Sequence, residues 1–387
     1  MQRILMVTAA VIAAVAASVS SAQTLKLGFM APMSGPSATA GQEMKRGLDA
    51  ALEKFNNRIG GLETHVVIAD DKGLPDTGAQ EIVRLIEREK IDVLSGLGLT
   101  NVMLAVTEPA VKANVIVLAS HAGTGNYAGK GCNPNIFLTG FLNDIFGETM
   151  GPWLTKRGIK RLYIMGLDFQ AGWDIYDALQ ANYKGQVVGK ALTPFTQVDF
   201  APELAQVRAA KPDALFAFYF GASGVSFPKQ YAQSGLKDRI PLYSVMAMSN
   251  SMLIAGQGDA GLGVISNSVW NAQIDNASNK DFVARFRAKN GREPTSYSSM
   301  MYDSMLLLDA ALRTGVDPAN RAALRRALKT VKFPSIRGDV QFGPNQVLRQ
   351  SMVLQEAVKD AKGEFMLKPL DTAAAPIDKY AKDCKMN

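Results

Sequence analysis

Few side chains in this sequence are suited to acid–base or nucleophilic catalysis. The chain has two histidines. His65 stands at the start of an apolar run, and His121 directly follows the run "NVIVLAS". A Ser-His-Asp site with His121 as base would need a serine at a sharp turn between a strand and a helix, flanked by glycine. The segment "GASGV", residues 221–225, has Val225 where that turn needs glycine. The sequence therefore predicts a protein that is not an enzyme, with His121 either as a ligand contact or as an ordinary loop residue.

Two glycine-containing segments test whether the chain binds a nucleotide. Residues 27–52, "LGFMAPMSGPSATAGQEMKRGLDAAL", read as a strand, a loop and a helix, whose first free N–H groups attract anions. The loop lacks the Gly-Lys-Ser/Thr of a phosphate loop. The segment "GTGNYA", residues 123–128, fits a loose dinucleotide fingerprint, but Gly129, Gly131 and Pro134 leave no room for its helix. No His, Cys or carboxylate cluster has the spacing of a metal site, so we expect neither cofactor nor metal.

Composition and charge are those of an ordinary globular protein. Of 387 residues, 47% are apolar and 20% are charged, as is typical of folded domains, and the length suggests two domains or lobes. The formal net charge is +7. It is spread along the chain without the basic block of a nucleic-acid-binding protein. We therefore expect no nucleic-acid partner.

The N-terminal segment, residues 1–22, predicts export. It has one basic residue, Arg3, then the apolar run 4–19, and ends in "SSA", the small residues that a signal peptidase needs. The alternative is a membrane anchor, but the apolar run is shorter than the ~20 residues that span a bilayer. We expect a cleaved secretory signal peptide and an exported mature chain.

The two cysteines, Cys132 and Cys384, lie far apart in the sequence. An exported chain meets oxidising conditions, in which a single pair of cysteines forms a disulfide. This pairing would attach the C-terminal tail to the body of the protein. The alternative is two free thiols, because sequence alone does not show that the two residues are close.

Apolar runs of strand length alternate with amphipathic segments along most of the chain. The runs include "TLKLGFM", "NVIVLAS", "RLYIMGL" and "ALFAFYF", and their near-continuous apolar character is typical of parallel strands covered on both faces. One set of strand–helix units ends near residue 140, and a second occupies about 158–270. A helical region, 279–332, and a hairpin-like segment, 338–358, follow. The pattern predicts an α/β protein of two lobes with a cleft between them.

In open parallel sheets, ligands bind outside the carboxyl ends of the strands. The loops at those ends carry polar and aromatic side chains that suit a small organic ligand. They are Ser34, Thr100, Asn101, Ser120, His121, Gln170, Trp173, Tyr219, Phe220 and Tyr297. Each of them is alternatively a core aromatic residue or a helix cap.

Five segments, in their order and spacing, resemble the periplasmic solute-binding proteins of ABC importers, in the Leu/Ile/Val-binding family. They are "APMSGPSATAG" at 31–41, "GLGLTNVMLAV" at 96–106, "NVIVLASHAG" at 114–123, "KRLYIMGLDFQAGWD" at 160–174 and "PTSYSSMMYDS" at 294–304. The resemblance covers nearly the whole mature chain. It implies a type I periplasmic binding fold, with two lobes, each a mainly parallel sheet flanked by helices. Three hinge crossings would join the lobes, which close on the ligand by hinge motion.

The resemblance also implies how the chain is divided between the lobes. The N-terminal lobe would consist of residues 23–143 plus 271–345. The C-terminal lobe would consist of residues 144–270 plus 346–370. The remaining residues, 371–387, would form a C-terminal tail.

Ligand contacts follow from the resemblance, residue by residue. Thr100 takes the place of the hydroxyl that binds the ligand carboxylate. The loop Ser120-His121-Ala122-Gly123 takes the place of the one that holds an amino-acid head group, here without the family's threonine hydroxyl and with His121 as a new feature.

Other positions differ from the family more strongly. Ala40 and Ala171 stand where relatives carry aromatic residues, whereas Phe220 and Tyr297 keep aromatic character. Met246 stands where relatives carry the acid that balances the α-ammonium group of an amino acid. A buried ammonium without such a partner costs several kcal/mol. The sequence therefore favours a ligand with a carboxylate and no ammonium, and a pocket wide enough for an aromatic or other bulky acid, such as a benzoate or a phenylpropanoid.

Alternatives to this ligand stay open. Asp168, Asp174 or Asp303 is a possible source of a displaced acid, which would fit a branched-chain or other hydrophobic amino acid. A ligand sensor on the same fold is the other alternative. The main hypothesis is a monomeric periplasmic protein that captures the solute and delivers it to an ABC permease in the inner membrane.

Overall fold

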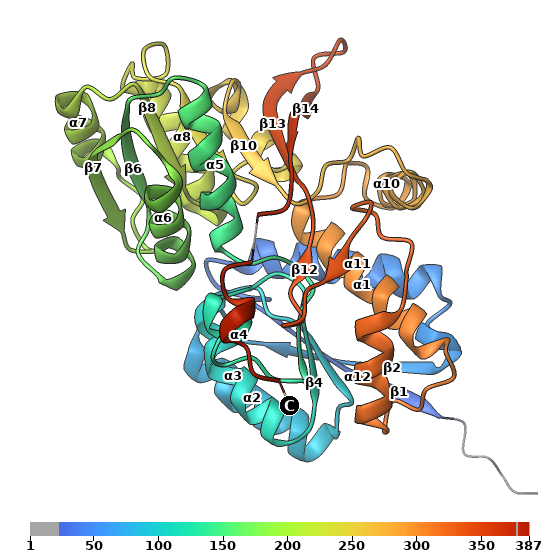
Figure 1. Cartoon of the computed structure of the whole chain (residues 1–387). Helices are drawn as coiled ribbons and strands as arrows, with labels where there is room; N and C mark the ends of the chain where they lie inside the picture. Colours follow the sequence, from blue (N-terminus) through green and yellow to red (C-terminus); the bar gives the residue numbers. More distant parts are fainter. Residues whose placement is uncertain (1–22, 377, 387) are drawn as a thin grey trace, which may run out of the picture.

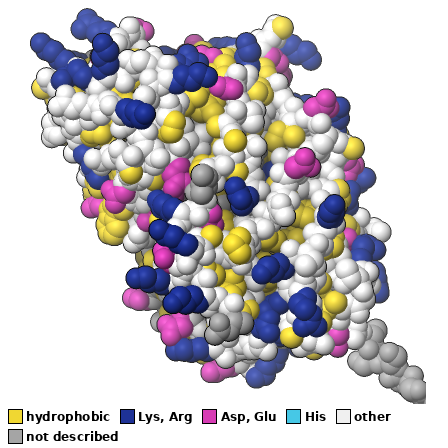
Figure 2. Space-filling view, in the orientation of Figure 1, with side chains coloured by type: hydrophobic (Ala, Val, Ile, Leu, Met, Phe, Trp, Pro, Cys, Tyr) yellow, Lys and Arg dark blue, Asp and Glu magenta, His cyan; other side chains and the backbone are white. Residues whose placement is uncertain are grey.

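The structure is a computed structural model of the chain and describes residues 23–376 and 378–386. The predicted signal peptide, residues 1–22, lies outside the described residues. Two lobes, each built around its own β-sheet, are stacked with the crossing segments between them (Figure 1). Within the described part of the chain, no helix combines the length and the apolar character that crossing a bilayer requires. Lys and Arg side chains are spread over both lobes, with acidic side chains among them (Figure 2).

The first lobe contains a parallel five-stranded sheet with the order β2-β1-β3-β4-β5. Its strands are β1 (Thr24–Ala31), β2 (Glu63–Asp70), β3 (Val93–Gly96), β4 (Ile116–Ala119) and β5 (Ile136–Leu138). Its helices are α1 (Ala38–Lys54), α2 (Pro75–Arg84, extended by one π-helical turn, Leu85–Glu89), α3 (Thr100–Lys112), α4 (Gly125–Ala128), α10 (Ala277–Asn290), α11 (Ser296–Leu312) and α12 (Arg321–Thr330). The predicted helical region 279–332 is thus three separate helices.

Side chains of β1 alternate between two apolar layers, as the pleat of a strand requires. Leu27 and Phe29 belong to the core formed with α1 and α11, and Met30 belongs to the core formed with α2 and α3. Helix α1 lies close to α11 because Gly47 faces the carbonyl of Ser298, where a Cβ would overlap with it. Both faces of the sheet are covered, which explains the near-continuous apolar strands.

The second lobe contains a seven-stranded sheet with the order β14-β13-β10-β9-β8-β6-β7, antiparallel only at its β10-β13-β14 edge. Its strands are β6 (Arg161–Leu167), β7 (Gln186–Thr193), β8 (Ala214–Phe218), β9 (Leu242–Val245), β10 (Ile265–Ser268), β13 (Met352–Lys359) and β14 (Phe365–Ala373). Its helices are α5 (Asp144–Lys156), α6 (Gln170–Asn182), α7 (Ala201–Ala210), α8 (Gly221–Gln233) and α9 (Ser251–Gln257). The predicted hairpin is the pair β11 (Gln341–Phe342) and β12 (Leu348–Arg349), which leads into β13.

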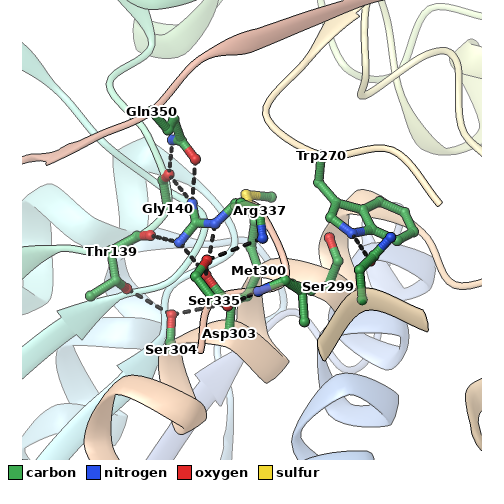
Figure 3. Close-up of polar contacts among 12 residues, drawn as sticks. Thr139, Gly140, Trp270, Ser299, Met300, Asp303, Ser304, Ser335, Arg337 and Gln350 are labelled. Atoms are coloured by element: carbon green, nitrogen blue, oxygen red, sulfur yellow. Dashed lines mark hydrogen bonds and ion pairs between the residues drawn. The ribbon is translucent and has the colours of Figure 1, made fainter. Parts of the chain in front are cut away.

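The chain passes between the lobes after β5, after β10 and before β13, which confirms the three predicted crossings. A buried ion pair between Arg337 and Asp303, with a distance of 2.8 Å, lies beside two of these crossings (Figure 3). Arg337 donates to the carbonyls of Thr139, at 2.8 Å, and Gly140, at 2.9 Å, in the first crossing, and to Gln350 Oε1, at 2.6 Å, in the third. The guanidinium therefore joins two crossings at the base of the hinge.

The C-terminal segment returns to the first lobe. Strand β14 runs to Ala373, beyond residue 371, where the sequence placed the start of a tail with weak structure. The ring of Tyr380 packs on Gly125, where it leaves no room for a Cβ, and its hydroxyl donates to Asp144 Oδ1 at 2.8 Å. Cys384 then forms a disulfide with Cys132, with a Cα–Cα distance of 5.6 Å, which confirms the predicted pairing. The tail is therefore a fourth connection between the lobes, and the disulfide attaches its end covalently to the first lobe.

Removal of this disulfide is expected to destabilise the protein. Replacement of both Cys132 and Cys384 with serine should lower the free energy of unfolding by about 2–5 kcal/mol, because the bond closes a loop of 252 residues in the unfolded chain. Urea denaturation followed by circular dichroism measures the change. The wild type, with its disulfide reduced by excess reductant, is the control. It should show the same loss of stability relative to the oxidised wild type. Equal urea midpoints for oxidised and reduced protein would contradict the expectation.

Candidate ligand-binding site

A cavity lies between the two lobes, lined mainly by apolar side chains with a few polar groups, as is typical of small-molecule sites. It forms where the carboxyl ends of the parallel strands of both sheets face each other and where helices α3, α6 and α8 begin. The first lobe contributes Gly98, Leu99, Thr100, His121, Ala122 and Tyr297, the first crossing contributes Phe141 and Asn143, and the second lobe contributes Phe146, Phe169, Ala171, Ile175, Phe218, Phe220, Val245, Met246 and Ala247.

Asn143 connects the two walls of the cavity. Its Nδ2 donates to Thr100 Oγ1 at 3.2 Å in the first lobe and to Asp174 Oδ2 at 2.9 Å on α6 of the second lobe. Residues on both walls of the cavity are almost fully buried, with 2% of Thr100 and 2% of Met246 exposed. The lobes therefore enclose the cavity.

The wall formed by the first lobe presents hydrogen-bond donors. Thr100 is the first residue of α3, so the N–H groups of this helical turn have no partners within the helix. The positive end of the helix dipole points in the same direction. Since Thr100 Oγ1 accepts from Asn143, its own hydroxyl proton is free to donate to a ligand. This wall suits a carboxylate, which needs several donors to replace its hydration.

His121 forms the edge of the same wall. Its ring stacks on Tyr297, with a centroid distance of 4.2 Å and an interplanar angle of 8°, and it meets Phe141 edge-on at 5.1 Å. Its Nε2 is buried and has no hydrogen-bond partner among the described residues. Burial lowers the pKa of His121 to about 3, against a smaller opposing effect of the Gly98 backbone. The imidazole is therefore neutral at neutral pH.

The wall formed by the second lobe is apolar and largely aromatic. Phe169 contacts Phe218 and Phe220, with ring centroids 5.9 and 6.0 Å apart. Ala171 and Ile175, on the first two turns of α6, leave space beside these rings. Aromatic pairs prefer the offset and edge-on arrangements that this cluster shows. The wall is therefore chemically complementary to a further apolar ring.

No charged side chain of the described residues lines the cavity. The three acids considered from the sequence are all engaged elsewhere. Asp168 accepts a hydrogen bond from Trp173 at 2.8 Å, Asp174 accepts from Asn143 and Gln170, and Asp303 pairs with Arg337. Met246 lines the cavity with a thioether, so the described wall has no carboxylate to balance an ammonium group.

Seven of the residues singled out from the sequence line the cavity, namely Thr100, His121, Ala122, Ala171, Phe220, Met246 and Tyr297. Two from the first loop do not. Ser34 lies at the surface, where its hydroxyl donates to Asp70 at 2.6 Å. Ala40 packs inside the first lobe with the α1 core. The space beside the phenylalanines is therefore left by Ala171 and not by Ala40.

Four further candidates lie close to the cavity without lining it. Ser120 uses its hydroxyl to donate to the Gly96 carbonyl at 2.9 Å. Gly123 is pressed against the carbonyl of Phe141. Asn101 is the second residue of α3, and its buried Oδ1 has no hydrogen-bond partner within the described part of the chain. Gln170 donates to Asp174 at 2.7 Å and lies beside the tail.

Most of the apolar wall was missed from the sequence. Phe218 and Val245 are the last residues of β8 and β9, and Phe169 is the N-cap of α6. The rule that ligands bind at the carboxyl ends of strands selects these positions too. From the sequence, the rule selected polar and aromatic residues of the loops, and the apolar residues that end the strands themselves were left out.

Comparison with known proteins gives relatives along most of the chain. The family model described as periplasmic binding protein matches residues 24–363. A protein named Leu/Ile/Val-binding protein homolog 6, from Brucella melitensis, is 26% identical over 377 residues, which cover 94% of this chain and 95% of the relative.

Two solved structures of ABC transporter solute-binding proteins are similar in fold and sequence. One, from R. palustris in complex with benzoate, has a TM-score of 0.88 and 29% identity, and covers 94% of this chain and 99% of its own. Another, from Rhodopseudomonas palustris BisB5 in complex with 3,4-dihydroxybenzoic acid, has a TM-score of 0.85 and 29% identity, and covers 92% of this chain and 99% of its own. The two-lobed architecture, the interlobe cavity and the family match agree, and the chain belongs to the periplasmic binding protein family, with the type I fold of the Leu/Ile/Val-binding proteins.

Proposed function

We propose that this protein is the solute-binding component of an ABC importer and that it captures a small aromatic carboxylic acid of the benzoate or phenylpropanoid type. The observation that carries the proposal is the composition of the cavity wall. A donor-rich side at the start of α3 faces an aromatic side, and no charged residue of the described chain lies between them. A ligand with one carboxylate and one ring matches both sides.

The same wall disfavours an amino acid. An α-ammonium group in this cavity would lose its water and find no carboxylate, at a cost of several kcal/mol. A carboxylate at the other wall meets the Thr100 hydroxyl and the free N–H groups of α3. The relatives bound to benzoate and 3,4-dihydroxybenzoic acid support the acid as ligand.

The proposed role also includes a location and a partner. The family is one of solute-binding folds, and its periplasmic location agrees with the signal peptide that we propose at residues 1–22. We propose that a monomer delivers the solute to a permease in the inner membrane, without catalysis. The alternative, a branched-chain or other hydrophobic amino acid, is favoured by the relatives named Leu/Ile/Val-binding. A ligand sensor on the same fold would differ in its membrane partner.

Isothermal titration calorimetry with matched ligands tests the proposal. The compounds 3-phenylpropanoate and phenylalanine have the same skeleton and differ only in the α-ammonium group. We expect the first, together with benzoate and 4-hydroxybenzoate, to bind at least about 100-fold more tightly than phenylalanine or leucine, since 100-fold corresponds to about 2.7 kcal/mol. Tight binding of leucine without binding of any of the acids would refute the proposal in favour of the alternative.

A further inference from the structure

The side chain of Asn143 does not do what an asparagine at its position usually does. Asn143 is the N-cap of α5, where an asparagine oxygen commonly accepts from the free N–H groups of the helix, yet it makes no such bond. Its backbone N–H donates to the Gly123 carbonyl of the first lobe at 3.0 Å. Its amide Nδ2 donates to Thr100 in one lobe and to Asp174 in the other. The side chain is therefore committed to contacts between the lobes.

The carboxylate of Asp174 fixes which way round the Asn143 amide lies. Its Oδ2 accepts from Asn143 Nδ2 at 2.9 Å, and its Oδ1 accepts from Gln170 Nε2 at 2.7 Å. An ionised carboxylate has acceptor atoms only. A reversed Asn143 amide would place its oxygen against Asp174 Oδ2, where the lone pairs of the two atoms repel each other. The amide nitrogen of Asn143 therefore has to face Asp174.

This orientation is passed on to Thr100. The amide nitrogen of Asn143 carries two N–H groups and accepts no hydrogen bond. One N–H is directed to Asp174, and the other to Thr100 Oγ1 at 3.2 Å. Thr100 is thus the acceptor in this contact, and its hydroxyl proton cannot be donated to Asn143. Because Thr100 and Asn143 both line the cavity, this proton is left for the ligand.

Asp174 itself lies behind the cavity wall. It is not among the residues that line the cavity, and it faces a separate, more open groove together with Lys130 and Tyr380. Its helix, α6, is held closely against α5, where Gly147 leaves no room for a Cβ beside the α6 backbone. Any effect of Asp174 on the ligand carboxylate is therefore transmitted by Asn143.

We propose that Asp174 is a positioning residue for the ligand carboxylate, which acts through Asn143 to keep the Thr100 hydroxyl as a donor to the ligand. The inference rests on the proposed function, because it requires a ligand with a carboxylate. Without the Asp174 carboxylate, the Asn143 amide is free to turn and to take the Thr100 proton with its own oxygen. The ligand then loses a charge-assisted hydrogen bond.

Calorimetric titration of the full chain with benzoate measures the effect. Asp174→Ala is expected to raise the Kd about tenfold or more, as does the loss of a hydrogen bond to a charged group. The matched control is Asp177→Ala, which removes a carboxylate from the same helix. The Asp177 side chain is 76% exposed, and this variant should keep the wild-type Kd. Thermal unfolding of each variant shows whether it is folded.

The conservative variant Asp174→Asn tests the hydrogen bond separately from the packing of α6. It keeps the shape of the side chain and one oxygen that accepts from Asn143, and Gln170 can turn its own amide to match. This variant should therefore lose clearly less benzoate affinity than Asp174→Ala. Equal losses in the two variants would overturn the inference.

A double-mutant cycle with Thr100→Val shows whether Asp174 acts through the Thr100 hydroxyl. Valine has nearly the shape of threonine and no hydroxyl, so Thr100→Val alone should also raise the Kd of benzoate about tenfold. In this background, Asp174→Ala should have almost no further effect, because the donor that it positions is already gone. A purely structural role of Asp174 predicts the same fold-change in both backgrounds.

The outcomes separate this inference from the proposed function. Equal fold-changes in the two backgrounds, or a wild-type Kd in either single variant, would overturn the role of Asp174 and leave the proposed function standing. Failure of every carboxylic acid to bind to the wild type would overturn the proposed function and, with it, this inference.

Discussion

Replacement of Met246 with glutamate is expected to weaken benzoate binding by at least about 100-fold and to improve the binding of leucine. Met246 is 2% exposed and lines the cavity, so the new carboxylate would face the ligand carboxylate in a dry site. Like charges placed together in this way cost several kcal/mol. The same carboxylate gives an α-ammonium group the partner that the wild-type wall lacks. Calorimetry with both ligands measures the two changes.

The matched control is Met246→Gln, which has nearly the same shape as glutamate and no charge. It should lose far less benzoate affinity than the glutamate variant, because the control brings a polar group without repulsion. Equal losses in the two variants would show that the thioether matters for packing and that charge does not decide the ligand class. A higher benzoate affinity in the glutamate variant would contradict the proposed orientation of the ligand.

Replacement of Arg337 with methionine is expected to lower the free energy of unfolding by about 3–5 kcal/mol. The side chains of Arg337 and Asp303 are 1% and 0% exposed, so the variant leaves a carboxylate buried without its partner. It also removes the hydrogen bonds to the carbonyls of Thr139 and Gly140. Urea denaturation measures the loss.

Two further variants show whether the uncompensated charge is the cause. Replacement of both partners, Arg337→Met with Asp303→Leu, should recover part of the loss, because no charge stays buried. Lys112→Met removes a surface pair with Glu108 in which the side chains are 75% and 69% exposed, and it should change stability by less than about 1 kcal/mol. A double variant as unstable as the single one would assign the loss to the hydrogen bonds with the crossings.

The fold could be predicted because its signals are local and repeated. Runs such as "IVLA" in β4 are buried on both faces, and this alone indicates a covered parallel sheet. The disulfide could be predicted because the chain offers a single pair of cysteines. The end of β14 could not, since residues 369–373, "PLDTA", are mostly exposed and pair only with β13 at the edge of the sheet, where burial leaves no pattern.

The site could be predicted only in part. Thr100, His121 and Met246 were found because they follow strands and can be compared with a family pattern. Thr100 keeps the hydroxyl of that pattern, whereas His121 and Met246 depart from it. Phe169 and Phe218 were missed because an apolar residue at a strand end has the same sequence signature as a core residue. The stacking of His121 on Tyr297 is a tertiary contact with no local sequence signal.

The tail gives the hinge a fixed limit of travel. Between Ala373, the last residue of β14, and Cys384, which is bonded to the first lobe, the chain has only residues 374–383. A fully extended chain spans at most about 3.3–3.6 Å per residue, so these two anchor points cannot separate by more than that length allows. This bound is a property of chain length. Unlike hydrogen bonds or ion pairs, it does not depend on salt, temperature or ligand. The largest opening between the lobes of the empty protein is thus limited by the number of residues in the C-terminal tail. The affinity for the solute depends instead on the residues that line the cavity.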